Sequence, residues 1–260
     1  MMVRPWLVVA SCLGTLSASA PATPPASQHY RVELKTSVVQ DLTALGQGEQ
    51  KQDFVNTGFV TVSAQDSAGG QSVTLQLDSL VPGESSPIPP DQAKVAAGMK
   101  WHGYRQPNGR VSGLKADAGS PLTAAIEPAL LDLFPPMKRG TGEGQIWTDT
   151  TDVENNGIAI RTVTNFQTSA DSLKTGNKVL KVLRLAGAFS SAMSGQQAGP
   201  QGSMGIEGNG TGTTTWLIGS DGICISASHT TNQSISVTLA QVPEPIPVKV
   251  KTEGTATLLP

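Results

Sequence analysis

The 260-residue chain is poor in the residues from which catalytic and metal sites are usually built. It has three histidines, His29, His102 and His229, and two cysteines, Cys12 and Cys224. The histidines lie far apart, and the His-x-x-x-His and Cys-x-x-Cys spacings that are typical of zinc sites do not occur. The sequence therefore predicts no metal site and no cofactor.

Charges and long apolar runs are scarce as well. Charged residues make up 15% of the chain, the formal net charge is −2, and Lys and Arg form no dense cluster that would attract phosphate groups. We therefore expect no nucleic-acid partner. No apolar run reaches the roughly 20 residues that a membrane-spanning helix needs, which predicts no transmembrane segment.

The first 22 residues have the pattern of a secretory signal peptide. Arg4 supplies a positive charge, residues 5–16 carry no formal charge and are mostly apolar, and small residues at 17–22 offer cleavage sites. A second interpretation stays open, because Val9-Ala10-Ser11-Cys12 resembles a bacterial lipobox, whose cysteine carries a lipid. We predict a secreted or periplasmic protein, with a lipoprotein tethered to a membrane through Cys12 as the alternative.

The predicted domain organisation follows from this N-terminus. It consists of a signal peptide at 1–22, a Pro- and Ala-rich spacer at 23–28, and a single β-rich domain at 29–260.

Most of that domain shows the polar–apolar alternation of half-buried strands, beginning with Tyr30, Val32 and Leu34. Turn residues such as Asn155-Asn156-Gly157 separate the runs. We expect strands at 29–38, 54–65, 72–80, 109–115, 144–153, 157–168, 178–189, 205–218, 222–230, 234–242 and 248–258. The Gly-, Ser- and Gln-rich stretch 190–205 predicts a mobile loop.

Two helices are expected to interrupt the strands. A short one spans 89–99, and a second spans 120–134, with Ser120 as N-cap, an apolar stripe, and a kink or a break that Pro128 is expected to cause near Ala124–Glu127. The predicted fold class is α+β, mostly β: a long curved antiparallel sheet, or half-barrel, with one or two short helices packed on its concave face.

No catalytic motif is apparent, and we predict that the protein is not an enzyme. Cys224 and His229 are the nearest nucleophile and base, but five residues apart on one strand their side chains are expected on opposite faces. Cys224 is therefore expected to be a buried free cysteine that packs as a small hydrophobic residue. Asp149, Asp152 and Glu154 are an alternative set of calcium ligands, with solvated carboxylates near a turn as the preferred interpretation.

The chain resembles two groups of bacterial proteins. Long antiparallel strands, a helical interruption and further long strands in an exported chain are similar to the half-barrel of lipoprotein carriers and lipid-binding envelope lipoproteins (LolA/LolB-like). More narrowly, Leu133–Gly140 leading into Gln145-Ile146-Trp147-Thr148 looks like an uncharacterised family of secreted bacterial proteins with a Pro-x-x-x-Gly-x-x-Trp pattern. Residues 141–144 lengthen that pattern here, and the strand around Gly109-Arg110-Val111 adds to the likeness. The resemblance predicts fold better than function.

These observations lead to three hypotheses. The first is an exported envelope protein whose concave sheet binds a lipid or another apolar ligand. The second is a structural or protein-interaction module of the envelope without a small ligand, and the third is an unrecognised hydrolase built from scattered residues. Under the first hypothesis the candidate ligand-binding residues are Trp101, Leu122, Ile126, Phe134, Trp147 and Trp216. Ordinary core packing is the alternative for the aromatic residues among them.

Overall fold

The computed structural model describes residues 27–67, 69–107, 109–119, 126–127, 129–137, 140–155, 157–175, 178–199, 202–240, 242 and 244–260. The predicted signal peptide, most of the predicted spacer and Cys12 lie outside these residues. The labelled helices are the 3-10 helix η1 (Thr43–Leu45) and the α-helix α1 (Pro90–Ala96), and a few residues between β5 and β6 are helical as well. The strands are β1 (Ser27–Asp41), β2 (Glu49–Ser67), β3 (Gly70–Pro82), β4 (Lys100–Arg105), β5 (Val111–Ala116), β6 (Ile146–Asn155), β7 (Ile158–Thr175), β8 (Lys178–Gly199), β9 (Gly202–Ile218), β10 (Cys224–Leu239) and β11 (Ile246–Leu258).

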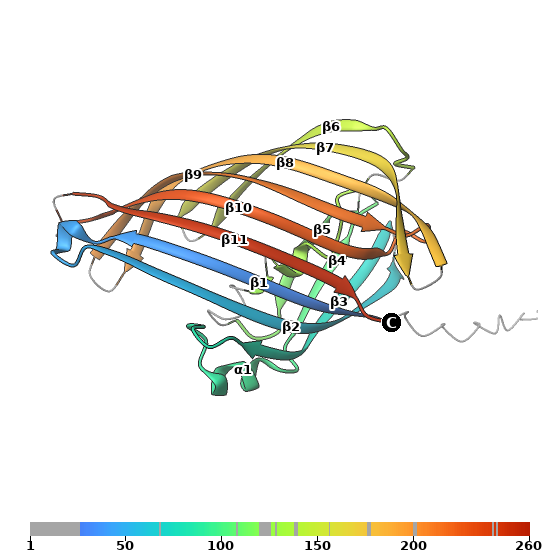
Figure 1. Ribbon diagram of the computed structural model, residues 1–260, viewed down its shortest axis with the longest axis horizontal. Coiled ribbons are helices and arrows are strands. Elements are labelled where there is room, and N and C mark those ends of the chain that lie inside the picture. The colour runs from blue at the N-terminus through green and yellow to red at the C-terminus, as the bar shows by residue number, and fades with distance from the viewer. Residues whose placement is uncertain are drawn as a thin grey trace, which may run out of the picture.

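All eleven strands belong to one antiparallel sheet, in the order β5-β4-β3-β2-β1-β11-β10-β9-β8-β7-β6. The first and last strands, β1 and β11, pair in the middle of this order, so each half of the chain forms a meander that runs outward from them. Figure 1 shows the long strands side by side in one curved sheet. The predicted fold class is confirmed.

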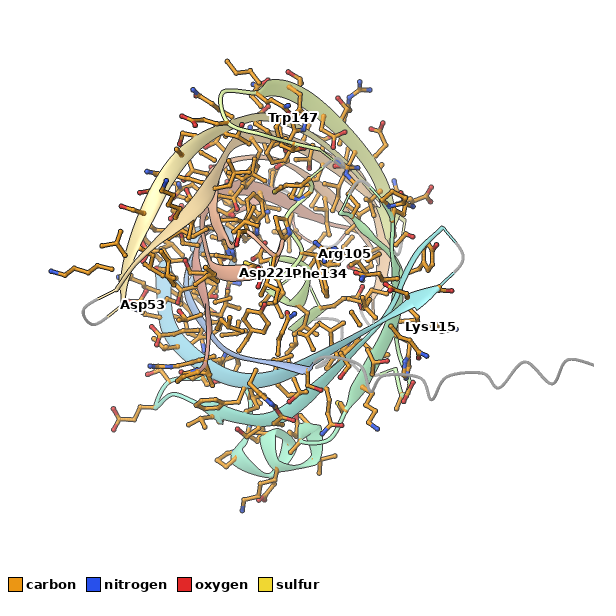
Figure 2. All side chains as sticks on the ribbon, turned by 90° about the vertical axis from the view of Figure 1, so that its right-hand side faces the viewer. Asp53, Arg105, Lys115, Phe134, Trp147 and Asp221 are labelled. Atoms are coloured by element: carbon orange, nitrogen blue, oxygen red, sulfur yellow. The ribbon has the colours of Figure 1, made fainter. Side chains whose placement is uncertain are left out.

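The sheet is curved but not closed, because its two edge strands, β5 and β6, are not hydrogen-bonded to each other. An ion pair between Arg110, next to β5, and Asp149 on β6 joins the two edges. Seen along the strands, the sheet surrounds an interior filled with side chains, with Phe134 near its centre (Figure 2).

The two faces of the sheet differ in polarity as the alternation predicts. On β1, Tyr30 and Val32 point inward and are buried, whereas Arg31, Glu33 and Lys35 lie on the outer face. Outer ion pairs such as Arg31–Glu33 (2.9 Å) are solvent-exposed and each contributes little to stability, about 0–1 kcal/mol. The fold therefore depends on the apolar residues of the concave face.

The segment between β5 and β6 fills part of the concave face. Ile126, Glu127 and 129–131 are helical, and Leu130, Leu133 and Phe134 are buried in the core. The stripe predicted for helix 120–134 thus faces the sheet in its described part, while Leu122, Pro128 and residues 124–125 of the predicted kink or break lie outside the described residues. The other predicted helix is α1, which packs beside β3 and buries Ala93 and Ala96. No helix among the described residues has the length and apolar character to span a membrane.

The prediction of a mobile loop at 190–205 is wrong. The described residues of this stretch, 190–199 and 202–205, form the end of β8 and the start of β9, which pair with each other up to Gly199 and Gly202. Its glycines permit close packing of neighbouring strands, since a Cβ on Gly195 would lie 2.1 Å from the carbonyl oxygen of Gly157. Hydrogen bonding on both sides of a central strand overrides a loop-like composition.

Two further differences concern strand boundaries and faces. The strands predicted at 222–230 and 234–242 are one strand, β10, and β1 begins at Ser27, inside the predicted spacer.

The prediction that Cys224 and His229 face opposite sides is also wrong. The register of β10 shifts between Cys224 and Ser226, and this β-bulge places both side chains on the concave face.

Candidate functional site

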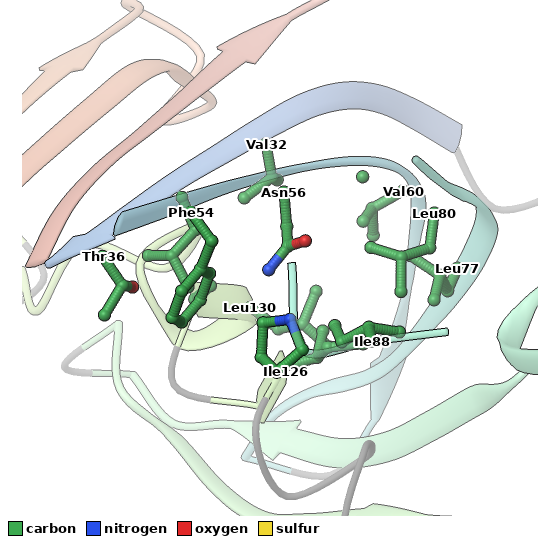
Figure 3. A pocket seen from close by; sticks show the side chains of 14 residues that line it. Val32, Thr36, Phe54, Asn56, Val60, Leu77, Leu80, Ile88, Ile126 and Leu130 are labelled. Atoms are coloured by element: carbon green, nitrogen blue, oxygen red, sulfur yellow. The ribbon is translucent and has the colours of Figure 1, made fainter. Parts of the chain in front are cut away.

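An apolar cavity of about 260 Å³ lies between the helical residues Ile126, Ala129 and Leu130 and the concave face of β1, β2 and β3. Figure 3 shows Ile126, Leu130 and Ile88 on one side of it and Val32 and Asn56 on the other. Its lining consists of Val32, Leu34, Thr36, Phe54, Asn56, Gly58, Val60, Leu77, Leu80, Pro87, Ile88, Ile126, Ala129 and Leu130. An apolar cavity of about 150 Å³ is enough to bind benzene, so this space can hold a larger apolar group.

Asn56 is the buried polar residue of this cavity. It is 9% exposed, and its Oδ1 accepts a hydrogen bond of 2.7 Å from the Ser86 hydroxyl. Ser86 belongs to the segment between β3 and α1, which also supplies Pro87 and Ile88 to the lining. The hydrogen bond therefore holds this covering segment against β2.

A second hollow, which we call the polar trough, adjoins the cavity and has a volume of about 500 Å³. Leu34, Thr36 and Ala129 line both spaces. The trough is rich in hydroxyl groups, from Thr36, Thr162, Thr164, Thr214, Thr231 and Thr252. Together the two spaces form a continuous lining that changes from apolar to polar.

The strand register explains this change. Residues paired across neighbouring strands form rows perpendicular to the strands, and alternate rows face the interior. The row through Val32 continues as Ala256, Ala227, Trp216 and Leu185. The next inward row runs Leu34, Gly254, His229, Thr214, Gly187 and Phe166. The row after that runs Thr36, Thr252, Thr231, Gly212, Phe189 and Thr164. The interior thus turns from apolar to polar over two rows.

An Asp–His pair lies in the trough. His229 Nδ1 is 2.5 Å from the Asp132 carboxylate, and both side chains are largely buried, at 16% and 28% exposed. Burial acts to lower the pKa of His229, but the hydrogen bond and the charge of Asp132 outweigh it, so the pKa is raised above its ordinary value of 6.5. Among the described residues, Asp132 is the one carboxylate that contacts His229.

Asp132 is held from a second direction, because its carbonyl oxygen accepts a hydrogen bond of 2.7 Å from Trp216 Nε1. Asp132 follows directly after the helical residues 129–131. The two contacts therefore fix the end of this helical segment to β9 and β10.

Three rings of the trough lie over glycines of the neighbouring strand. Phe166 pairs with Gly187, Phe189 with Gly212, and His229 with Gly254. A Cβ on Gly254 would be 2.2 Å from His229 Cε1, and one on Gly212 would be 2.4 Å from Phe189 Cζ. The glycines thus leave the space that these rings occupy.

The predicted ligand-binding residues fall into different surroundings. Ile126 lines the cavity and Trp216 lines the trough. Trp101 and Phe134 are part of the packed core, and Trp147 stacks on Phe166 with ring centroids 5.2 Å apart. Leu122 and Cys12 lie outside the described residues.

Sequence reasoning did not anticipate the Asp132–His229 pair or the threonine rows. His229 and Thr231 stand two residues apart on one strand, which was a usable indication of a polar stripe on one face. Asp132 carried no such indication, since its partner is distant in the sequence.

The remaining titratable candidates lie apart from these two spaces. Asp149 pairs with Arg110, while Asp152 is 3.9 Å from Arg161, and no group of three metal-ligating side chains occurs in the described part of the chain. Burial raises the pKa of the Cys224 thiol to about 12, with the charge of Asp132 adding to the shift. Its thiolate is therefore scarce at neutral pH.

Comparison with known proteins does not establish a family. No family model matches the chain, and no curated protein matches it. Among solved structures, it is similar to Acinetobacter baumannii OccAB4, with a TM-score of 0.25 and 8% identity over 90% of this chain and 99% of that chain. A TM-score of this size supports no inference about fold or function.

Proposed function

We propose that this protein is an exported cell-envelope protein that binds an apolar ligand without catalysing a reaction. The observation that carries the proposal is the apolar cavity that Ile126, Ala129 and Leu130 form with β1–β3. A structural module without a ligand needs no such space, and protein interiors are otherwise packed nearly without voids larger than a water molecule. The export part of the proposal rests on the signal-peptide pattern of residues 1–22.

An alkyl chain is the ligand group that suits this lining. Most of the side chains around the cavity are aliphatic, and each buried methylene contributes about 0.8 kcal/mol of transfer free energy. Ordering the chain and restricting its motion offset part of this gain. We expect dissociation constants of about 1–100 µM for single-chain ligands.

Displacement of a neutral fluorescent probe tests the proposal. N-phenyl-1-naphthylamine is expected to gain fluorescence with the purified protein and to be displaced by decanol. Mass spectrometry of organic extracts from the natively purified protein would identify a co-purified lipid. Absence of probe binding together with ligand-free extracts would refute the proposal.

Substitution of Ile88 gives the structural control. Ile88 is half-buried, lines the cavity and lies in the segment before α1, so Ile88→Trp should fill the space without disturbing the sheet. Val95 on α1 is 73% exposed and lies outside the lining, which makes Val95→Trp the matched control. We expect Ile88→Trp to abolish probe binding with an unchanged or higher melting temperature, and Val95→Trp to bind as the wild type does.

A further inference from the structure

The polar trough has the features of a binding site in its own right. Its six threonines make no side-chain hydrogen bond to another residue in the part of the chain that the structure describes, and five of them are half-buried while Thr214 is 9% exposed. Partly buried hydroxyls need partners, because desolvating them without a hydrogen bond is unfavourable. A ligand rich in hydroxyl groups supplies both donors and acceptors to such a lining.

The charges of the trough argue against an ionic head group. Among the described residues that line it, Asp132 and His229 are the only ionisable ones, and they are paired with each other. Among the residues that the structure describes, no Lys or Arg belongs to this lining, whereas sites for phosphate or carboxylate typically use those side chains. The site is therefore suited to an uncharged polar group.

The aromatic residues add flat apolar surfaces beside the hydroxyls. Phe166, Phe189 and Trp216 all line the trough, and Phe166 and Phe189 are laid over glycines of the adjacent strands. A sugar ring has the matching chemistry, with apolar C–H groups on its faces and hydroxyls around its edge. The negative faces of aromatic rings suit the C–H groups of the sugar, and the threonine hydroxyls suit its hydroxyl groups.

The trough also lies where the head group of a bound lipid would be. Leu34, Thr36 and Ala129 line both it and the apolar cavity, so a single molecule can occupy the two spaces. We propose that the trough binds the uncharged, polyhydroxylated head group of an amphiphile whose alkyl chain fills the cavity, which makes a glycosylated lipid the ligand class. This inference rests on the proposed function and specifies its ligand.

Ligands with one tail and different heads test the inference. Calorimetric titrations would use n-decyl β-glucopyranoside, decanol and decyl phosphate, each below its micellar concentration. The glucoside is expected to bind about tenfold more tightly than decanol, since two or three added hydrogen bonds to neutral groups suffice for that factor, and the phosphate more weakly than decanol.

Isosteric substitutions locate the effect in the trough. Thr231 and Thr252 are partners on β10 and β11, and the double variant Thr231→Val/Thr252→Val removes their hydroxyls with little change in volume. It should lower glucoside affinity about three- to tenfold and leave decanol binding unchanged. Thr255→Val, on the exposed outer face of β11, is the control and should bind all three ligands as the wild type does.

The outcomes separate the two proposals. Equal affinities for all three heads, with binding still blocked by Ile88→Trp, would overturn the head-group inference and leave the proposed function standing. Tighter binding of decyl phosphate would overturn the inference in favour of an anionic head. If none of the decyl compounds binds, both proposals fail.

Discussion

Replacing Gly254 with alanine tests how the sheet positions His229. An added Cβ would lie 2.2 Å from Cε1 and 2.8 Å from Nδ1 of the imidazole, so the ring has to move away from β11. That movement breaks the 2.5 Å contact with Asp132. A hydrogen bond to a charged group contributes about 1.5–3 kcal/mol, and the preference for alanine over glycine within a strand offsets about 0.5–1 kcal/mol. We expect a net destabilisation of about 1–2 kcal/mol from these two terms.

Urea unfolding followed by tryptophan fluorescence measures this cost, and thermal unfolding should show a decrease of about 2–8 °C for a domain of this size. Gly205→Ala is the matched control, because the nearest atom to its added Cβ, Thr238 Cβ, is 3.5 Å away. In a His229→Ala background, Gly254→Ala should become neutral or stabilising. If Gly254→Ala destabilises the protein equally with and without the imidazole, the clash with His229 is not the cause and the reasoning fails.

Three other predictions concern the same interior. The pKa of His229 is raised in the folded protein, so its protonation stabilises the fold. This stabilisation is present in full below pH 6.5 and is lost as the pH rises through the folded-state pKa of His229. Asp132→Asn should therefore cost more unfolding free energy at pH 5.5 than at pH 9. Equal costs at both pH values would contradict this assignment. Cys224 is buried and its thiol pKa is about 12, so it should resist iodoacetamide at pH 8 in the native protein and react in 8 M urea. Fast labelling of Cys224 in the native protein, located by peptide mapping, would contradict its burial. Decanol at about 100 times its dissociation constant should raise the unfolding free energy of the wild type by about 2.7 kcal/mol. The unfolding free energy of Ile88→Trp should not change, and a rise in that variant would mean that decanol binds outside the cavity.

The strands were predictable because alternation is a local property. Tyr30, Val32 and Leu34 define the inward face of β1 without reference to any other strand, and Asn155-Asn156-Gly157 marks the turn after β6. The prediction failed where glycine and serine serve packing between strands, as in the stretch 190–205. Composition alone does not distinguish a glycine in a loop from one that makes room for a neighbouring strand.

The faces of side chains were predictable only where the register is regular. The bulge between Cys224 and Ser226 interrupts the alternation of side chains between the two faces of β10, so Cys224 lies on the same face as His229. A bulge inserts one residue relative to the partner strand, so its position depends on β9 and not on the sequence of β10 alone.

The sequence by itself determined that this chain forms long amphipathic strands, a helical segment with an apolar stripe, and turns between them, because periodicity and turn residues act over a few neighbouring positions. The tertiary structure alone decided that β1 pairs with β11, that Asp132 meets His229, and that the hydroxyl-rich row lies beside the apolar cavity. These features depend on which strands pair and in what register. Such pairing is fixed by packing between residues far apart in the chain, so no local pattern carries it.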